Sequence, residues 1–344
     1  MRTLPGLIRR RPADLDVRHD PALVEEVVFR SVRQLEETGG GRIPRTYRLR
    51  RDRCYEIELP EAREAAFRAV HDELFRAVGL AAAVPRALDE FAGLPGTLDR
   101  VNVRRVVSAG EEGAELYVGE GSPPRRTVVV RTRIETWLDP EGLARVLRHE
   151  IGHVADMLDP AFAYDPDPAI PGETAARRAV ALERFPILWA IRVDGRAEGR
   201  GLAPLRPRDE WWAECLRLYG PAASAGAFER IRSDPALTQA DLLAAGLDPA
   251  RLDPSDAPPS GAAAAGWRVH APCPLCSFPS PDWVSDPGRL PPEVLRRILS
   301  RFPAWSPEDG LCGRCAEVFA ALPDRASLPG PIVGETYRFP IGSG

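Results

Sequence analysis

The chain has 344 residues, of which 44% are hydrophobic and 28% charged, and its formal net charge is -4. This composition excludes a disordered chain and indicates a folded protein long enough for two domains. All 46 basic residues are arginine, so lysine chemistry is excluded. The negative charge argues against general affinity for nucleic acid or for anionic membranes, while leaving room for a local basic patch.

The sequence also bears on location. The basic N-terminal stretch MRTLPGLIRRR has an apolar run too short for a signal peptide, and no run of about 18 apolar residues follows anywhere. Four of the six cysteines form two C-x-x-C pairs, which inside a cell favour metal binding over disulfides. We therefore expect a cytoplasmic protein without membrane association.

The first 140 residues predict helices followed by strands. Apolar spacing predicts a helix over residues 24–35, TYRLRRDRCYEIEL is expected to form one or two strands, and a second helix is expected from Pro60 to Gly79, with His71 packed in the core. Three extended segments, residues 101–107, 114–118 and 126–134, are expected to form a meander. The third, RTVVVRTRI, is expected to present an edge to an extended substrate.

The next segment predicts a helix that carries the main motif. Asp139, Pro140 and Glu141 supply an N-cap, a first-turn proline and an acidic first turn, so a helix is expected to begin there. Residues 160–207 are expected to be largely irregular, with one helix over residues 173–182. Another helix is predicted over residues 209–219, ending at a Gly-Pro pair.

The motif R-H-E-I-G-H within the first of these helices predicts a metal site. His149 and His153 are one helical turn apart, so both imidazoles point the same way and can bind one zinc ion. Glu150 is too close in sequence to join them as a ligand, but it can reach a water at the metal and serve as general base. Asp156 is expected to accept the remaining N–H of a zinc-bound imidazole.

Two histidines need a third protein ligand, and several carboxylates compete. Asp159 lies ten residues after His149. The favoured candidate is Glu210, at the start of a predicted helix, with Glu214 one turn later in a supporting position. The interpretation therefore leaves Asp159 and Glu214 open as alternatives to Glu210.

Two segments together resemble a known peptidase family. H-E-I-G-H-V-A-D, residues 149–156, and E-W-W-A-E-C-L-R-L, residues 210–218, resemble the gluzincin catalytic domains related to anthrax lethal factor. The resemblance implies that His149, His153 and Glu210 ligate zinc and that Glu150 is the base. The family's oxyanion-stabilising tyrosine has no clear counterpart, and Tyr164 or Tyr219 is the candidate for it.

The C-terminal cysteines predict a second metal site. Cys273, Cys276, Cys312 and Cys315 form two C-x-x-C hooks, and four thiolates complete a closed tetrahedral shell around a structural zinc. The 35-residue spacer contains a predicted helix over residues 291–302. Two disulfides or a redox pair are the rival interpretations. Cys54 and Cys215 are expected to pack as small apolar groups.

These features predict an α+β protein: a zincin-like domain with an active-site helix and a small mixed or antiparallel sheet, followed by a zinc ribbon-like domain. The expected layout is a helical extension (1–45), the peptidase domain (46–250), a linker (251–266), the ribbon (267–325) and a tail (326–344). The predicted activity is zinc-dependent peptide hydrolysis, with a protein or peptide as substrate.

Two alternatives to this activity stay open. The chain could be a non-catalytic interaction protein, although Glu150 has no purpose in a purely structural histidine site. A peptidase domain followed by a cysteine ribbon also resembles the SprT and Spartan group, which cleaves proteins crosslinked to DNA. That group uses a histidine as third ligand, and no histidine lies between His153 and His270 here.

Overall fold

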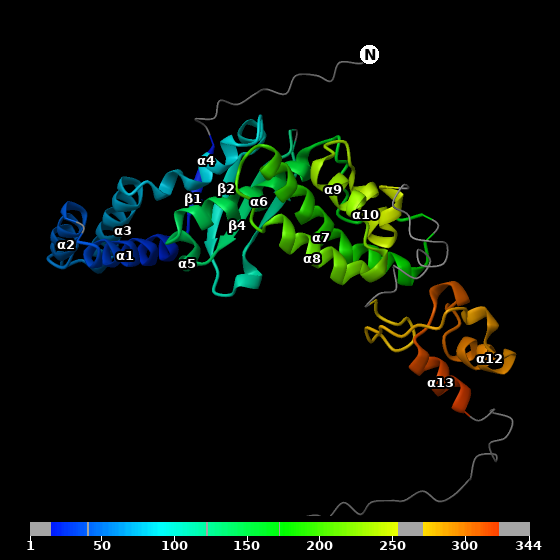
Figure 1. The fold of residues 1–344 in the computed structure, drawn as a ribbon. Coiled ribbons are helices and arrows are strands. Elements are labelled where there is room, and N and C mark those ends of the chain that lie inside the picture. The colour runs from blue at the N-terminus through cyan, green and yellow to red at the C-terminus, as the bar shows by residue number, and fades with distance from the viewer. Residues whose placement is uncertain (1–14, 40, 122, 172, 254–270, 323–344) are drawn as a thin grey trace, which may run out of the picture.

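The computed structural model describes residues 15–39, 41–121, 123–171, 173–253 and 271–322. Figure 1 shows a central region of sheet and helices, with helices α1 to α3 at one end and helices α12 and α13 near the other. Within the described residues, no helix is both long and apolar enough to cross a bilayer. The class is α+β, with one small mixed sheet.

The sheet has the strand order β1-β2-β4-β3. Strands β1 (Asp16–His19), β2 (Arg100–Arg105) and β4 (Arg126–Thr132) run parallel to one another, and β3 (Gly113–Val118) pairs antiparallel with β4. The expected meander is therefore wrong, because β4 lies between β2 and β3. For the same reason β4 has no free edge, and the edge near the motif helix belongs to β3.

Helices cover one face of this sheet. Val101, Val103, Val128 and Val130 are fully buried while their neighbours in the strands are only partly covered, so the alternation follows the strand period of two. The helices of this half are α1 (Pro21–Glu37), α2 (Arg42–Cys54), α3 (Pro60–Ala77), α4 (Ala83–Asp89), α5 (Ile134–Trp137) and α6 (Pro140–Leu158).

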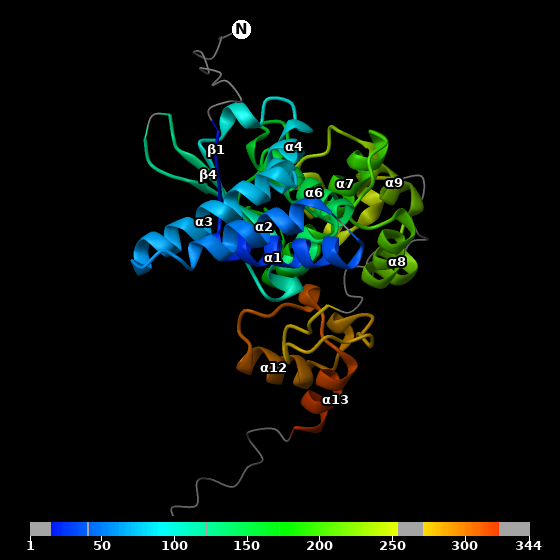
Figure 2. The same ribbon diagram turned by 90° about the vertical axis from the view of Figure 1, so that its left-hand side faces the viewer.

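The N-terminal segment belongs to the same core as the sheet. β1 is a strand of that sheet, and Leu23, Val27 and Val28 of α1 share one buried cluster with the strand valines and with Leu147 and Ile151 of α6. The boundary proposed near residue 45 therefore does not separate two cores. Helices α1, α2 and α3 pack on one another as an arm that faces the viewer in Figure 2.

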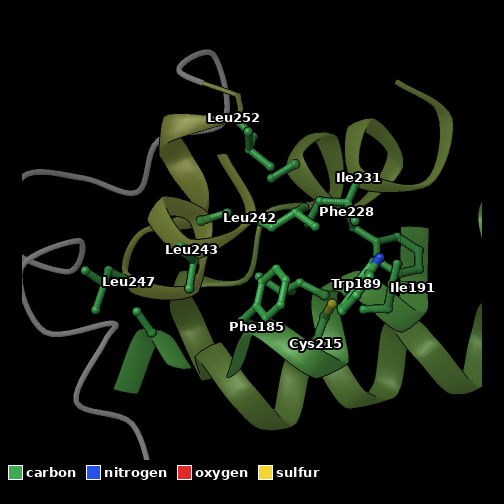
Figure 3. Close-up of a cluster of buried hydrophobic side chains, with 14 of the residues drawn as sticks. Phe185, Trp189, Ile191, Cys215, Phe228, Ile231, Leu242, Leu243, Leu247 and Leu252 are labelled. Atoms are coloured by element: carbon green, nitrogen blue, oxygen red, sulfur yellow. The ribbon is translucent and has the colours of Figure 1, made fainter. Parts of the chain in front are cut away.

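A second core lies among the helices that follow α6. They are α7 (Ala175–Gly199), α8 (Arg208–Tyr219), α9 (Ala225–Ser233) and α10 (Gln239–Leu247). Figure 3 shows Phe185, Trp189 and Ile191 of α7 meeting side chains of α9 and α10 in this cluster. The irregular segment predicted for residues 160–207 is thus mostly one long helix, which continues past Pro186.

Helix α2 replaces the strands expected in TYRLRRDRCYEIEL. Its buried residues are Pro44, Tyr47 and Cys54, which recur at intervals of three and seven residues, as one face of a helix does. The strand interpretation was wrong because the apolar residues that alternate with arginine do not share one face: Tyr47 is buried, whereas Leu49 is 61% exposed.

The C-terminal module forms a third core. It contains α12 (Pro292–Arg301) and α13 (Gly313–Ala321), and its buried cluster includes three of the four hook cysteines with Ile298, Trp305 and Leu311. The helix predicted over residues 291–302 is confirmed. Trp283 packs against both this cluster and the second core, so the module touches the rest of the protein. The proposed linker from residue 254 onward and the tail 326–344 lie outside the described residues.

Candidate metal centre and general base

His149 and His153 meet as the helix spacing predicts. Helix α6 begins at Pro140, with the Asp139 carboxylate accepting a hydrogen bond from the backbone N–H of Glu141, so the predicted start is confirmed. The Nε2 atoms of His149 and His153 lie 3.2 Å apart. Two nitrogens on one tetrahedral zinc, at bonds of about 2.0–2.1 Å, are separated by about 3.3 Å. The two imidazoles therefore fit one zinc ion.

Both imidazoles are held in positions that leave Nε2 available. His149 is buried, and its Nδ1 lies 2.8 Å from Oδ1 of Asp194 on α7, so Nδ1 carries the proton and Nε2 the lone pair. Burial lowers the pKa of His153 well below its usual range. Its ring stacks edge-on against Trp189, with centroids 4.5 Å apart. Neutral imidazoles are the form that binds metal.

Asp194 is the residue that orients His149, and the sequence analysis did not predict it. Besides His149, its carboxylate accepts hydrogen bonds from the backbone N–H groups of Leu205 and Arg206 and from the indole of Trp211. Burial opposes its ionisation, but the hydrogen bonds from His149, Arg206 and Trp211 outweigh burial and lower the pKa of Asp194. The sequence did contain a signal for Asp194, because this carboxylate lies within the largely apolar run LWAIRVDG and a buried acid needs hydrogen-bonding partners.

Close packing of α6 on α7 brings Asp194 to His149. A Cβ atom on Gly152 would lie 2.6 Å from Cγ1 of Val193, and a Cβ atom on Gly195 would lie 2.5 Å from the backbone oxygen of Arg232. Such distances are shorter than any van der Waals contact. The two glycines therefore allow α7 to lie against α6 on one side and against α9 on the other, with Asp194 between them.

Glu150 reaches the edge of the sheet. Its Oε2 accepts a hydrogen bond of 3.0 Å from the backbone N–H of Ala114 on β3. Burial raises the pKa of Glu150, and the nearby His149 ring and the hydrogen bond from Ala114 only partly oppose this rise. The carboxylate thus lies between the histidine helix α6 and the edge strand β3.

The role predicted for Asp156 is filled by Asp194. The buried Asp156 carboxylate instead makes a bidentate ion pair with Arg196, at 2.6 and 2.7 Å, and accepts a hydrogen bond of 2.7 Å from the Trp189 indole. These partners lie on α7. Asp156 therefore ties α6 to α7 and supports the site only through that contact.

The third ligand is not gathered with the histidines. Within the described residues, the four hook cysteines are the only group of three or more His, Cys, Asp or Glu side chains whose ligand atoms lie within 4.8 Å of one another. The Glu210 side chain is 55% exposed and lies 3.3 Å from Nε of Arg206, and Glu214 pairs with Arg217. The next residue, Trp211, nevertheless contacts the site through Asp194.

The other predicted site residues, Asp159, Tyr219 and Tyr164, differ in how close they lie to the histidine pair. Asp159 caps the C-terminal end of α6, where its carboxylate accepts a hydrogen bond of 2.9 Å from the backbone N–H of Ala161. Tyr219 is buried and donates its hydroxyl hydrogen to the Ala245 carbonyl at 2.9 Å. Tyr164 lies against Trp189 at 5.3 Å, one ring removed from His153.

The four hook cysteines cluster within metal-binding distance of one another. Sγ of Cys273 lies 3.8 Å from Sγ of Cys315, and Sγ of Cys276 lies 3.9 Å from Sγ of Cys312. Sulfurs of a tetrahedral zinc site, at bonds of about 2.3 Å, are about 3.8 Å apart. The cluster therefore fits one zinc ion, in a closed shell without a position for water.

Backbone geometry builds this cluster. Ser277, with φ 60°, turns the chain after the first hook and donates its N–H to the Cys273 carbonyl, and the amides of Cys312 and Cys315 point at the sulfurs of Cys273 and Cys312. Burial raises the pKa of Cys312 and of Cys315. Burial also acts on Cys273, but amide hydrogen bonds outweigh it and lower its pKa.

The other cysteines and His71 behave as packing groups, as predicted. Cys54 and Cys215 are buried, and burial raises the pKa of Cys215 to about 12. His71 is buried and lies 3.2 Å from the Tyr47 hydroxyl.

Comparisons with family models, with curated proteins and with solved structures find no match to this chain.

Proposed function

We propose that this protein is a zinc-dependent metallopeptidase with His149 and His153 as metal ligands and Glu150 as general base. The observation that carries the proposal is the pair of Nε2 atoms 3.2 Å apart with the Glu150 carboxylate bonded at the edge of β3. Zinc, when bound there, supplies a Lewis acid that polarises a peptide carbonyl and lowers the pKa of water.

The residues of the chain would handle the protons. Glu150 accepts a proton from the attacking water and returns it to the leaving amide nitrogen. Asp194 keeps the His149 ring in one tautomer and one orientation, and stabilises positive charge on it. Burial of Glu150 suits this cycle because it raises the pKa of the carboxyl and makes proton return easier.

The free edge of β3 supplies a binding surface for an extended peptide. The backbone N–H of Gly119 donates to the Arg125 carbonyl, on the β4 side of the strand, whereas the backbone N–H of Ala114 points away from β4 and donates to Glu150. Since alternate residues of an antiparallel strand point to the same side, the backbone groups of Leu116 and Val118 also face the free edge. A peptide added there would run directly past Glu150.

Glu210 remains the proposed third ligand. Its helix α8 is tied to the site by the Trp211 indole, which shares the Asp194 carboxylate with His149. The Glu210 carboxylate now pairs with the exposed Arg206 side chain, and exposed ion pairs stabilise a fold by only about 0–1 kcal/mol. A side-chain rotation would therefore cost little. The likeness of the two motifs to the lethal factor group agrees with this assignment and stays part of the proposal.

The proposal includes the cellular setting and one structural ion. The hook cysteines would hold the second zinc, and four reduced thiolates favour an intracellular, cytoplasmic location. A Spartan-like activity on DNA-associated proteins has less support, because the described residues bring no third histidine to the pair.

The test uses Glu150→Gln beside the wild type. Hydrolysis of a denatured protein such as casein should fall by at least about 10²-fold, the usual contribution of a general base, with zinc content unchanged. Glu210→Gln should instead lower the content of the labile zinc by about one ion per chain. Full activity in Glu150→Gln would refute the peptidase, and full zinc content in Glu210→Gln would refute that ligand alone.

A further inference from the structure

Helix α2 concentrates positive charge in a protein that is negative overall. Its sequence RIPRTYRLRRDRC contains six arginines against one aspartate, a local charge of +5, whereas the chain carries -4. The buried side of the helix, with Pro44, Tyr47 and Cys54, packs toward α1 and α3. Five of the six arginines are exposed on the other sides, and only Arg51 lies partly covered beside Tyr47.

The outward face of α2 is a stripe of arginines without acidic partners. Arg42, Arg45, Leu49 and Arg53 follow one another at intervals of three, four and four residues, which places them on one side of a helix. In the part of the chain that the structure describes, no carboxylate lies within 4.0 Å of these three guanidinium groups. By contrast Arg48 pairs with Glu36, and Arg50 with Glu73, so the acids nearby are already used.

A pocket opens between α2 and α3 beside this stripe. It has a volume of about 180 Å³, enough for one large side chain. Its walls are mainly apolar, from Ile43, Thr46 and Tyr47 of α2 and Val70, Leu74 and Ala77 of α3. Arg42, Arg50 and Glu73 also line it, and the Glu73 carboxylate is neutralised by its ion pair with Arg50. Leu49 is 61% exposed on the same helix.

We propose that the outward face of α2 and this pocket dock an acidic segment of a partner protein, with one large apolar side chain of that segment anchored in the pocket. Carboxylates suit the arginines, because guanidinium groups bind carboxylate bidentately. An apolar anchor in a pocket surrounded by charged contacts is the usual arrangement at the centre of a protein interface. The docking does not depend on the peptidase activity.

The shape of the surface favours a protein over the other polyanions. Nucleic acid bases stack on aromatic rings, whereas this pocket is mostly aliphatic. A membrane-binding helix needs a broad apolar face, whereas the outward stripe of α2 has Leu49 alone among arginines. A pocket is useful only to a ligand with a side chain to insert.

The test measures binding of two labelled 15-residue peptides to the full chain by fluorescence anisotropy. The first carries Glu with Leu, Phe and Leu at positions i, i+3 and i+7, and the second has Ser at these three positions. The first should bind at least ten-fold more tightly, and its affinity should fall with added salt. Arg42→Glu with Arg45→Glu should weaken it at least ten-fold, whereas Arg104→Glu with Arg105→Glu on β2, two exposed arginines, should not.

A second pair of variants tests the pocket itself. Ala77→Trp and Thr46→Trp introduce a large ring on facing walls at exposed positions, and each should remove the difference between the two peptides while thermal unfolding is unchanged. Equal binding of the two peptides to wild type, or no binding of the first at 100 μM, would overturn the proposal. So would tighter binding of duplex DNA with the same loss in the arginine variant, which would indicate a nucleic-acid surface.

Discussion

His149 and Asp194 form a buried hydrogen bond of 2.8 Å between helices α6 and α7. The bond joins the motif to a residue 45 positions away, and the same carboxylate holds Trp211 of α8. One carboxylate therefore joins three helices around the two imidazoles. The candidate site is thus a property of the helix packing as much as of the motif.

Asp194→Asn should weaken the labile zinc without affecting the cysteine site. The neutral amide of asparagine has no negative charge to offer the His149 ring, and it can turn its NH₂ group toward Nδ1. The ring then loses its fixed orientation, and Nε2 becomes a weaker base and a weaker ligand. Loss of such a carboxylate typically costs 10–100-fold in metal affinity. Zinc release to a chelator, followed colorimetrically, checks this. Asp159→Asn at the exposed end of α6 is the matched control, and an equal loss there would make Asp159 a ligand instead.

Gly152→Ala should destabilise the protein by about 1–3 kcal/mol, because the new methyl group overlaps Val193 and cannot be accommodated without moving α7. Val193→Ala alone should destabilise by leaving a cavity. The double variant should recover part of the combined loss, since each change makes room for the other. Urea unfolding of the four proteins gives the coupling free energy. Strict additivity would show that the two residues do not meet.

Local patterns predicted most of the elements, and the long-range arrangement escaped them. Caps, prolines and apolar spacing act within a few residues, and they predict the start of α6, helix α8 and helix α12 between the two cysteine hooks. The order of β3 and β4 depends on which strands pair across the whole sheet, and no local signal encodes it.

The candidate site shows the same division. The four-residue spacing of His149 and His153 is a local signal, and it correctly predicts that their Nε2 atoms meet, 3.2 Å apart. The partner of His149, Asp194, lies on α7, which is longer than the helix predicted for this segment. The helix predicted over residues 173–182 instead continues through Pro186 to Gly199 as α7 and brings Asp194 into place. Asp156 lies one helical turn after His153, but Arg196 and Trp189 of α7 bind its carboxylate instead.

Removal of the structural zinc should unfold the C-terminal module first. Its core is small and is built around the hook cysteines, so zinc held by these cysteines would be coupled to the folding of the module. In a strong chelator under reducing conditions, amide hydrogen exchange should rise over residues 271–322 while α6 and α7 stay protected. Cys276→Ser should have the same effect without chelator, and Cys54→Ser should not. Unchanged protection in the metal-free protein would show that the module folds without zinc.

The acid stability of the protein should depend on His19. This residue ends β1, its ring packs against Phe75 and Trp137 with centroids 5.0 and 5.7 Å apart, and its Nε2 is buried without a partner among the described residues. Burial lowers the pKa of His19 to about 4.

The sign follows from which state binds more protons. The pKa of an unfolded histidine is about 6.5, so between pH 6.5 and 4 the unfolded chain is more protonated at this position, and the free energy of unfolding falls as the pH falls. The shift corresponds to a loss of up to about 3 kcal/mol at pH 4. His19→Gln cannot titrate, so the loss between pH 7 and 4 should be smaller in this variant by that amount. Urea unfolding at several pH values provides the measurement, and the comparison cancels the titration of other groups. Parallel pH curves for the two proteins would show that His19 takes up its proton in the folded state.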